Sequence, residues 1–503
     1  MSNRIDYFDS ESLKKDLKGR TARGGAITAV AQVVSILLTF GTLPILADLL
    51  DPEDYGLLAM VTVFTGFAAM FVDAGFTSAT IQKNELTHQQ SSNLLWISTA
   101  IGTLLALVMA AIAPVISWIY QEPRLVMITL ALASTFPLTG LALQHQALLR
   151  RALRQKHLAY VTIGSQVCGV SLALAWAWNY QDTPHDYWAL VLMTVTASVT
   201  RAVGMWLASG WRPSFLRRGQ GTRELVVFGA NLTGFNFINY FSRNADNVLI
   251  GWWWGAASLG VYERAYKLFL APLMLINAPL AGVIVPSLSR LSNEEEKLEN
   301  AYLRVLKMLA LIAMPVSVMV LVTADYLVLT LLGPDWVDAA PILRWLALVG
   351  ILQPISNSTG WLFTAKGKTA EMLKLAYFSA PVTLASFVAG LPWGANGVAA
   401  AYAISGIAFR FPILLYWLKR HKMVDINKIA GVFYYGIPAS LAVATTSVIV
   451  IWILTNFLVK PSALLVTGSC VTASVISWSI AIGINRSARS LYLEQLKAIS
   501  HKA

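Results

Sequence analysis

The chain has 503 residues, of which 56% are hydrophobic and only 13% are charged. Soluble domains carry about 25% charged residues, so this composition excludes a protein whose main solvent is water. The net charge of +12 does not by itself predict a nucleic-acid partner, because such binding needs a basic face on a soluble domain.

Apolar runs long enough to cross a membrane follow one another along the whole chain, since a spanning helix needs about 20 mostly apolar residues. We expect fourteen transmembrane helices, near residues 24–47, 56–79, 92–119, 125–148, 158–179, 187–208, 225–250, 257–283, 302–323, 340–365, 371–390, 395–418, 429–456 and 462–484. The loops between them are too short to hold a folded domain of ordinary size. The sequence therefore predicts an all-α integral membrane protein.

A weak internal repeat suggests how these helices are grouped. The hairpin turn Asp54-Tyr55-Gly56-Leu57 is similar to Ser258-Leu259-Gly260-Val261, and six expected helices fit between the starts of the two hairpins. An even number gives both halves the same orientation, as in parallel repeats with the substrate site between them. The predicted domains are a cytoplasmic N-terminal segment (1–23), a six-helix N-lobe (24–208), a cytoplasmic linker (209–224), a six-helix C-lobe (225–418), two further helices (429–484) and a cytoplasmic amphipathic tail (485–503).

The positions of the 38 Lys and Arg residues predict the orientation, because cytoplasmic loops accumulate these residues. With both termini in the cytoplasm, the external segments hold only Arg124 and Lys460. The cations within the expected spans include Arg201, Arg243, Arg264, Lys267, Arg344 and Arg410. The polar N-terminus also lacks the basic start and short apolar core of a cleavable signal. We therefore predict an even number of spans with both termini cytoplasmic.

Polar residues concentrate in the two spans expected at 225–250 and 257–283. Each ionisable group at mid-membrane costs about 2.5 to 3.5 kcal/mol, so these groups are expected to face a cavity or a partner. The candidate substrate-binding residues are Asn231, Asn236, Asn239, Arg243, Asn247, Arg264 and Lys267, and the candidate coupling or cavity acids are Asp73, Asp246 and Glu263.

Local neutralisation is the structural alternative for this group. Arg243 and Asp246 are three residues apart, and Glu263 and Lys267 are four apart, both spacings at which side chains meet on a helix. After such pairing Arg264 has no acid of its own. A guanidinium facing water suits a phosphate, because its fork of donors matches phosphate oxygens. Asp73, in contrast, either pairs across helices or binds a coupling ion.

Catalytic and metal-binding patterns are absent from the sequence. Cys168 and Cys470 each lie in an apolar run, and there is no Walker loop, HExxH or GxSxG motif. The one candidate for an external catalytic loop, Asp51-Pro52-Glu53-Asp54, is better explained as an acidic helix start, where negative charge suits the helix dipole. We expect no catalytic residues, no metal and no cofactor.

The second half of the chain carries motifs of a known family. They are Phe228-Gly229-Ala230-Asn231, Asn244-Ala245-Asp246-Asn247, Leu249-Ile250-Gly251, Leu259-Gly260-Val261-Tyr262, Arg264-Ala265-Tyr266 and Pro286-Ser287-Leu288-Ser289-Arg290. With Asp54-Tyr55-Gly56 and Asp73-Ala74-Gly75, they resemble the polysaccharide flippases related to the colanic acid exporter (Wzx type). That family lies in the multidrug, oligosaccharidyl-lipid and polysaccharide (MOP) exporter superfamily. Asn231, Asp246 and Arg264 match the family pattern, whereas Glu263 and Lys267 depart from it.

The resemblance implies two six-helix lobes around a central cavity, plus two C-terminal helices. It implies a flippase that turns an undecaprenyl-diphosphate-linked oligosaccharide from the cytoplasmic to the periplasmic leaflet of a bacterial inner membrane by alternating access, for surface polysaccharide (lipopolysaccharide or exopolysaccharide) biosynthesis. The implied partners are the lipid-linked oligosaccharide, the bilayer, a polysaccharide polymerase and a chain-length regulator. Proton or sodium coupling stays open.

Two other functions are weighed against this one. A cation-coupled multidrug exporter of the same superfamily is disfavoured, because a cationic drug would prefer unpaired acids to a basic cavity. A membrane enzyme such as a glycan polymerase or ligase would need an external loop with paired carboxylates.

Overall fold

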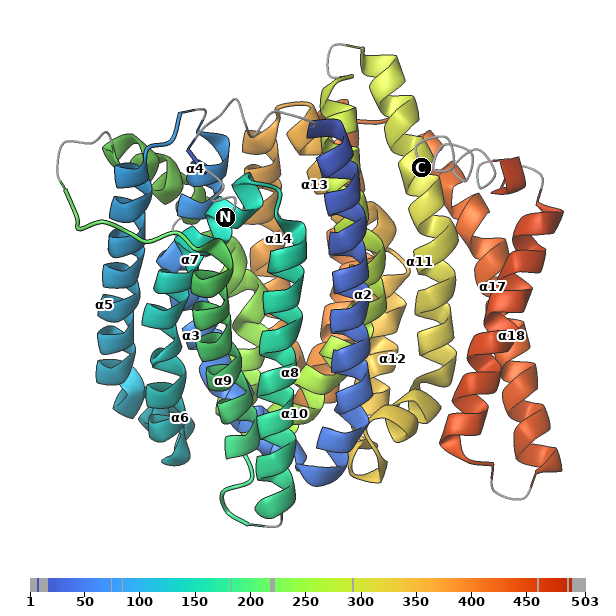
Figure 1. The fold of residues 1–503 in the computed structure, drawn as a ribbon. Coiled ribbons are helices and arrows are strands. Elements are labelled where there is room, and N and C mark those ends of the chain that lie inside the picture. The colour runs from blue at the N-terminus through green and yellow to red at the C-terminus, as the bar shows by residue number, and fades with distance from the viewer. Residues whose placement is uncertain are drawn as a thin grey trace. The chain divides into compact units, whose positions relative to one another are not determined.

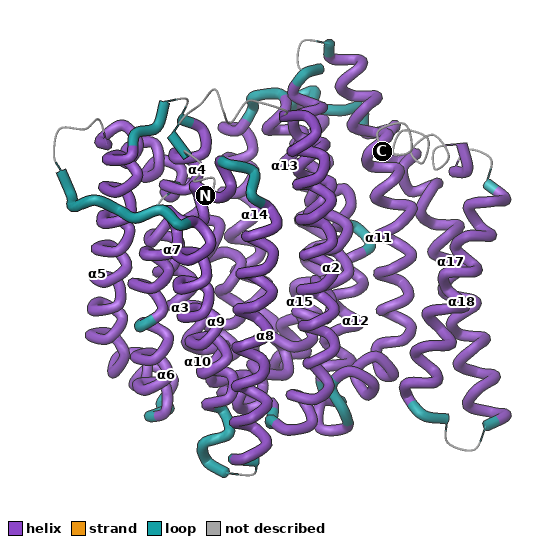
Figure 2. The backbone as a smooth tube through the Cα atoms, viewed as in Figure 1, coloured by secondary structure: helices purple, strands orange, loops and turns teal. Residues whose placement is uncertain are grey.

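The computed structural model describes residues 7–8, 17–73, 75–83, 85–181, 183–217, 222–291, 294–458, 461–485 and 488–490. Throughout these ranges the regular structure is helical, and no strand occurs in them (Figures 1 and 2). The prediction of an all-α membrane protein is thus confirmed. The chain forms two compact units, Met1–Gly260 and Val261–Ala503, which are described in turn.

The first unit is a bundle of long apolar helices. Within it, α5 packs on α7, α8 packs on α9, and α2 packs on α8. The helices are α2 (Leu17–Leu49), α3 (Pro52–Asp73), α4 (Phe76–Gln82), α5 (His88–Tyr120), α6 (Arg124–Ala133), α7 (Thr135–Arg151), α8 (Gln155–Asn179), α9 (Trp188–Ser209) and the first part of α10 (Thr222–Ser289).

The second unit begins within α10 and is built around α11, which packs on α17 and α18. The last two helices form the antiparallel hairpin coloured red in Figure 1. The elements after α10 are α11 (Glu295–Leu331), η1 (Pro334–Trp336), α12 (Ala339–Gly350), α13 (Gln353–Ala365), α14 (Thr369–Gly390), η2 (Leu391–Trp393), α15 (Gly394–Ser405), the π-helical turn η3 (Gly406–Arg410), α16 (Phe411–Arg420), α17 (Ile426–Phe457) and α18 (Ala463–Ile484).

Helices cover every span expected from the sequence, but several spans are joined or broken. Among the described residues, ten helices are long and apolar enough to cross a membrane, or eleven if α12 and α13, bent by 50°, count as one span. The helical segment Ala370–Arg420 covers two of the expected spans, and α10 covers two more. The exact number of fourteen stays a prediction.

Glycines with positive φ mark two of these breaks. Gly255 (φ 80°) interrupts α10, and Gly75 (φ 70°) separates α3 from α4. Glycine adopts such a backbone without the steric cost that a side chain would add. The break at Gly255 falls between the spans expected at 225–250 and 257–283, whereas hydropathy alone does not show the break at Gly75.

The two hairpin turns with similar sequences lie against each other in the first unit. A Cβ atom added to Gly56 would lie 1.8 Å from the carbonyl oxygen of Ala256, and one added to Gly260 would lie 1.8 Å from that of Pro52. Only glycine allows the two backbones to approach so closely. The contact fixes the start of α3 against the end of this unit's part of α10.

Candidate functional site

The first part of α10 carries six of the ten predicted site residues. The side chains of Asn231, Asn236, Asn239 and Arg243 lie outside the described residues, although the backbone there is helical. Of the remaining two, Asn247 is half-buried. The preceding residue, Asp246, is buried, and its carboxylate accepts a hydrogen bond from the backbone N–H of Asn247 at 2.9 Å. The predicted Arg243–Asp246 pair therefore stays a prediction.

The second part of α10 brings Glu263, Arg264 and Lys267 together. Lys267 Nζ forms an ion pair with Glu263 Oε1, as the four-residue spacing predicts, and Arg264 Nε lies 3.3 Å from Glu263 Oε2. The side chains of Glu263 and Arg264 are only 14% and 13% exposed, whereas Lys267 is 57% exposed. One carboxylate thus serves two cations, and the three groups together keep a surplus of one positive charge.

Arg264 differs here from the expectation drawn from the sequence, which gave it no acid of its own. Adjacent residues on a helix do not usually face each other. The two oxygens of the Glu263 carboxylate point to different cations, so this one acid contacts both Arg264 and Lys267. Spacing rules alone miss this arrangement, because it depends on side-chain rotamers.

Asp73 lies at the break between α3 and α4. Its Oδ1 atom accepts hydrogen bonds from the backbone N–H of Thr77 at 3.0 Å and from the Thr77 hydroxyl at 2.8 Å. Such contacts satisfy the exposed backbone donors of a helix start. This structural role was absent from the sequence interpretation. The run Asp73-Ala74-Gly75-Phe76-Thr77, with a glycine inside an apolar stretch, is the signal that could have found it.

Three other cations within the expected spans have protein partners. Arg201 donates to Gln146 Oε1 at 2.9 Å, and Arg344 forms an ion pair with Asp325. Arg410 donates to the carbonyl oxygen of Tyr402 at 2.6 Å and lies 3.9 Å from the centroid of that ring. These contacts give each of the three a structural role.

Acidic residues near the start of α3 are also held by structural contacts. Arg124, at the start of α6, forms ion pairs with Glu53 and with Glu122. Asp54 accepts a hydrogen bond from the backbone N–H of Asp51 at 2.9 Å. The hydrogen bond from Arg124 holds the pKa of Glu122 below its ordinary value. The acidic run at 51–54 is therefore a helix start, as the sequence indicated.

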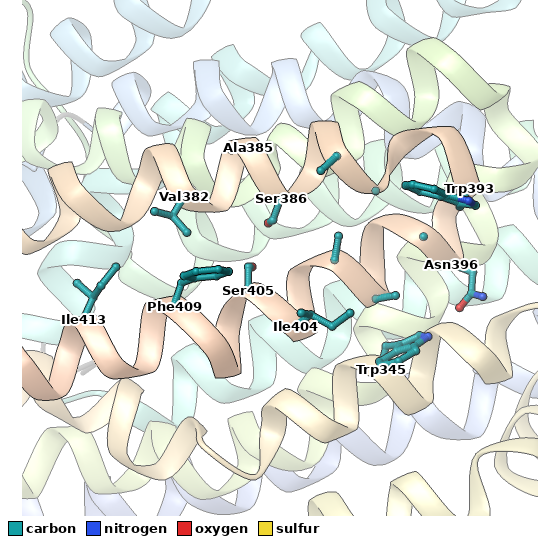
Figure 3. Close-up of a pocket in the computed structure, with 15 residues that line it drawn as sticks. Trp345, Val382, Ala385, Ser386, Trp393, Asn396, Ile404, Ser405, Phe409 and Ile413 are labelled. Atoms are coloured by element: carbon teal, nitrogen blue, oxygen red, sulfur yellow. The ribbon is translucent and has the colours of Figure 1, made fainter.

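An apolar groove in the second unit was not predicted. It has a volume of about 780 Å³ and lies between α14 and the α15–α16 segment, with Trp345 of α12 on one side (Figure 3). Its lining residues are Trp345, Val382, Ala385, Ser386, Ala389, Gly390, Trp393, Asn396, Gly397, Ala400, Ala401, Ile404, Ser405, Phe409 and Ile413. The many small residues between 385 and 401 are the signal in the sequence that could have indicated it.

This fold defines the chain as a multi-pass membrane protein. Its structure is similar to that of the lipid II flippase MurJ in an inward closed conformation, with a TM-score of 0.68 and 14% identity, covering 90% of this chain and 97% of MurJ. At this identity the likeness concerns the fold.

The family follows from the sequence comparison. The chain belongs to the family described as polysaccharide biosynthesis protein, which matches residues 45–341. It is 29% identical to the teichuronic acid biosynthesis protein TuaB of Bacillus subtilis over 347 residues, covering 69% of this chain and 71% of TuaB. It is 23% identical to the lipopolysaccharide biosynthesis protein WzxC of Escherichia coli over 380 residues, covering 74% and 76%. The resemblance to the Wzx-type family is thus confirmed.

Proposed function

We propose that this protein moves a lipid-linked oligosaccharide from the cytoplasmic to the periplasmic leaflet of a bacterial inner membrane. The observation that carries the proposal is the positively charged group on α10, where one carboxylate serves both Arg264 and Lys267. The family of polysaccharide biosynthesis proteins and the likeness to a lipid II flippase support the same substrate class. The protein acts as a carrier and not as an enzyme.

The diphosphate of the substrate is the part that these cations bind. A guanidinium presents paired N–H donors to phosphate oxygens, and Lys267 adds a mobile point charge. Two cations beside one carboxylate give this group of three side chains a net positive charge, and the low exposure of Arg264 strengthens its attraction for an arriving dianion. Arg243 adds a further cation, and the asparagines of α10 donate to sugar hydroxyls.

Transport then needs the loaded site to open alternately to the two leaflets. Asp73, Asp246 and Glu263 are the acids that could take up a proton or a sodium ion during this cycle. Both termini lie in the cytoplasm, and a polysaccharide polymerase and a chain-length regulator take over the product outside. A cationic drug is a poorer substrate, because the surplus charge on α10 repels it.

The test is a flipping assay in proteoliposomes under an imposed ion gradient. A radiolabelled undecaprenyl-diphosphate oligosaccharide is scored by its accessibility to a sugar-modifying enzyme outside the vesicles. We expect exposure that depends on the protein, a loss of about 100-fold for Arg264→Ala, as for a buried charge-assisted contact, and an unchanged rate for Arg344→Ala. Full flipping by Arg264→Ala would contradict the assigned site, and efflux of organic cations without flipping would contradict the function itself.

A further inference from the structure

A second cavity adjoins the apolar groove at its charged end. It has a volume of about 610 Å³ and shares the side chains of Val382 and Ile413 with the first. Its other lining residues are Glu371, Lys374, Phe378, Tyr416, Trp417, Arg420 and His421. The two cavities form one groove between α14 and the α15–α16 segment, apolar along most of its length and charged at one end.

The apolar part of the groove is suited to a hydrocarbon chain. Its two serines are already occupied, since Ser386 donates to the carbonyl oxygen of Thr383 at 2.7 Å and Ser405 donates to that of Tyr402 at 3.1 Å. Ile404 and Phe409 are more than half exposed on its wall. Exposed apolar walls in a membrane-spanning segment are solvated by lipid chains and not by water.

The charged end carries a surplus of positive charge. Glu371 is the acid there, and it pairs with Lys374 at 2.6 Å and lies 3.3 Å from His421 Nε2. Arg420 donates to the hydroxyl of Tyr416 at 3.0 Å. With Glu371 neutralised by Lys374, the Arg420 guanidinium remains as the net charge of the cavity, and a phosphate is its natural ligand.

The length of the groove favours an ordinary acyl chain over a long polyprenyl chain. From Lys374 to Gly390, α14 rises by about 24 Å at 1.5 Å per residue. The groove ends at the turn between α14 and α15, where a Cβ atom on Gly390 would lie 2.4 Å from the carbonyl oxygen of Gly397. A chain entering from the charged end therefore runs along this length of α14 before it reaches the hairpin.

We propose that this groove is a binding site for an anionic phospholipid of the bilayer, with the phosphate at Arg420 and one acyl chain between α14 and the α15–α16 segment. Basic pockets between transmembrane helices are known to hold such headgroups. The site is separate from the charged group on α10 and does not depend on the function proposed above.

Native mass spectrometry of the delipidated full-length protein tests the proposal. The probes are phosphatidylglycerol, phosphatidylcholine and undecaprenyl phosphate, each added at increasing concentration. We expect phosphatidylglycerol to bind best. Arg420→Gln should weaken its binding about fivefold, the effect of one cation near a charged headgroup, while Lys419→Gln, a change at an exposed neighbour outside the groove, should not.

Two substitutions to phenylalanine test the apolar part of the groove by filling it, one from α14 and one from α15. Ala385→Phe and Ala400→Phe should each abolish phosphatidylglycerol binding, whereas Leu384→Phe, which points away from the lining, should keep it. If one of these two filling variants does not fold, the other still tests the proposal. Equal binding of phosphatidylglycerol and phosphatidylcholine, or full binding by both filling variants, would overturn the proposal. Preferential binding of undecaprenyl phosphate would also overturn it and assign the groove to the transport substrate.

Discussion

Glu263 holds two cations at once, and its removal tests how that charge is balanced. Glu263→Gln leaves the nearly buried Arg264 without this carboxylate, so we expect a loss of about 3 kcal/mol in the free energy of unfolding, as when one partner of a buried ion pair is removed. Lys267→Gln should cost less than about 1 kcal/mol, because Lys267 is 57% exposed. Equilibrium unfolding in mixed detergent micelles measures both values. Equal losses would show that Glu263 is stabilised mainly by Lys267.

Glu122 gives a pH dependence whose sign follows from its pKa. Because Arg124 lowers the pKa of Glu122 in the folded protein, the ion pair stabilises the fold above the ordinary glutamate pKa, and this stability is lost as the pH falls through the lowered value. Glu122→Gln should therefore reduce the melting temperature at neutral pH, by the equivalent of about 1 kcal/mol or less, and the difference should vanish in acid. Glu294→Gln, in an exposed pair with Lys297, is the control. If the melting temperature of Glu122→Gln stays below that of the wild type in acid, the ion pair with Arg124 is not the cause of the difference.

Side-chain partners were only partly predictable from the sequence. The pair between Glu263 and Lys267 follows from helical spacing and is present. The contact between Glu263 and Arg264 depends on rotamers, and the bonds from Thr77 to Asp73 depend on a helix break. Neither rotamers nor breaks are visible in a hydropathy pattern.

At the scale of elements, the positions of the helices were predictable and their continuity was not. Apolar runs of about 20 residues have no other stable form in a membrane than a helix. The expected span at 340–365 is nevertheless two helices bent by 50°, and the one at 56–79 is α3 and α4, separated at Gly75. These breaks depend on single glycines and on packing. The groove beside α14 was missed for the same reason, because it depends on which small residues face each other.

The glycine contact at the start of α3 makes a prediction about folding. Gly56→Ala and Gly260→Ala each place a Cβ atom 1.8 Å from a backbone carbonyl oxygen, so the backbones must move apart. We expect each change to destabilise the protein by about 3 kcal/mol or to prevent folding, at or beyond the upper range for overpacking. Gly164→Ala in α8 meets nothing within 4 Å and should be neutral or slightly stabilising. Melting temperatures in detergent compare the three, and a melting temperature near the wild-type value for Gly260→Ala would contradict the contact.

At the scale of the whole molecule, the charge distribution predicts the orientation. Lys and Arg collect on the cytoplasmic side, which places Lys83 and Arg489 in the cytoplasm and His185 outside. Twelve expected spans lie between Lys83 and Arg489, so both residues face the same side only if that number is even. The same measurement therefore tests both the orientation and the parity of the fourteen spans.

Cysteine labelling in intact cells provides this measurement. With Cys168 and Cys470 replaced by alanine, His185→Cys should react with a membrane-impermeant maleimide, while Lys83→Cys and Arg489→Cys should react only after the membrane is permeabilised. Labelling of Arg489→Cys but not of Lys83→Cys in intact cells would mean an odd number of spans between them. The two additional helices α17 and α18 form a hairpin that begins and ends on one side, so an error of one span would have to lie before α17, where α10, α12 and α13 are interrupted or bent.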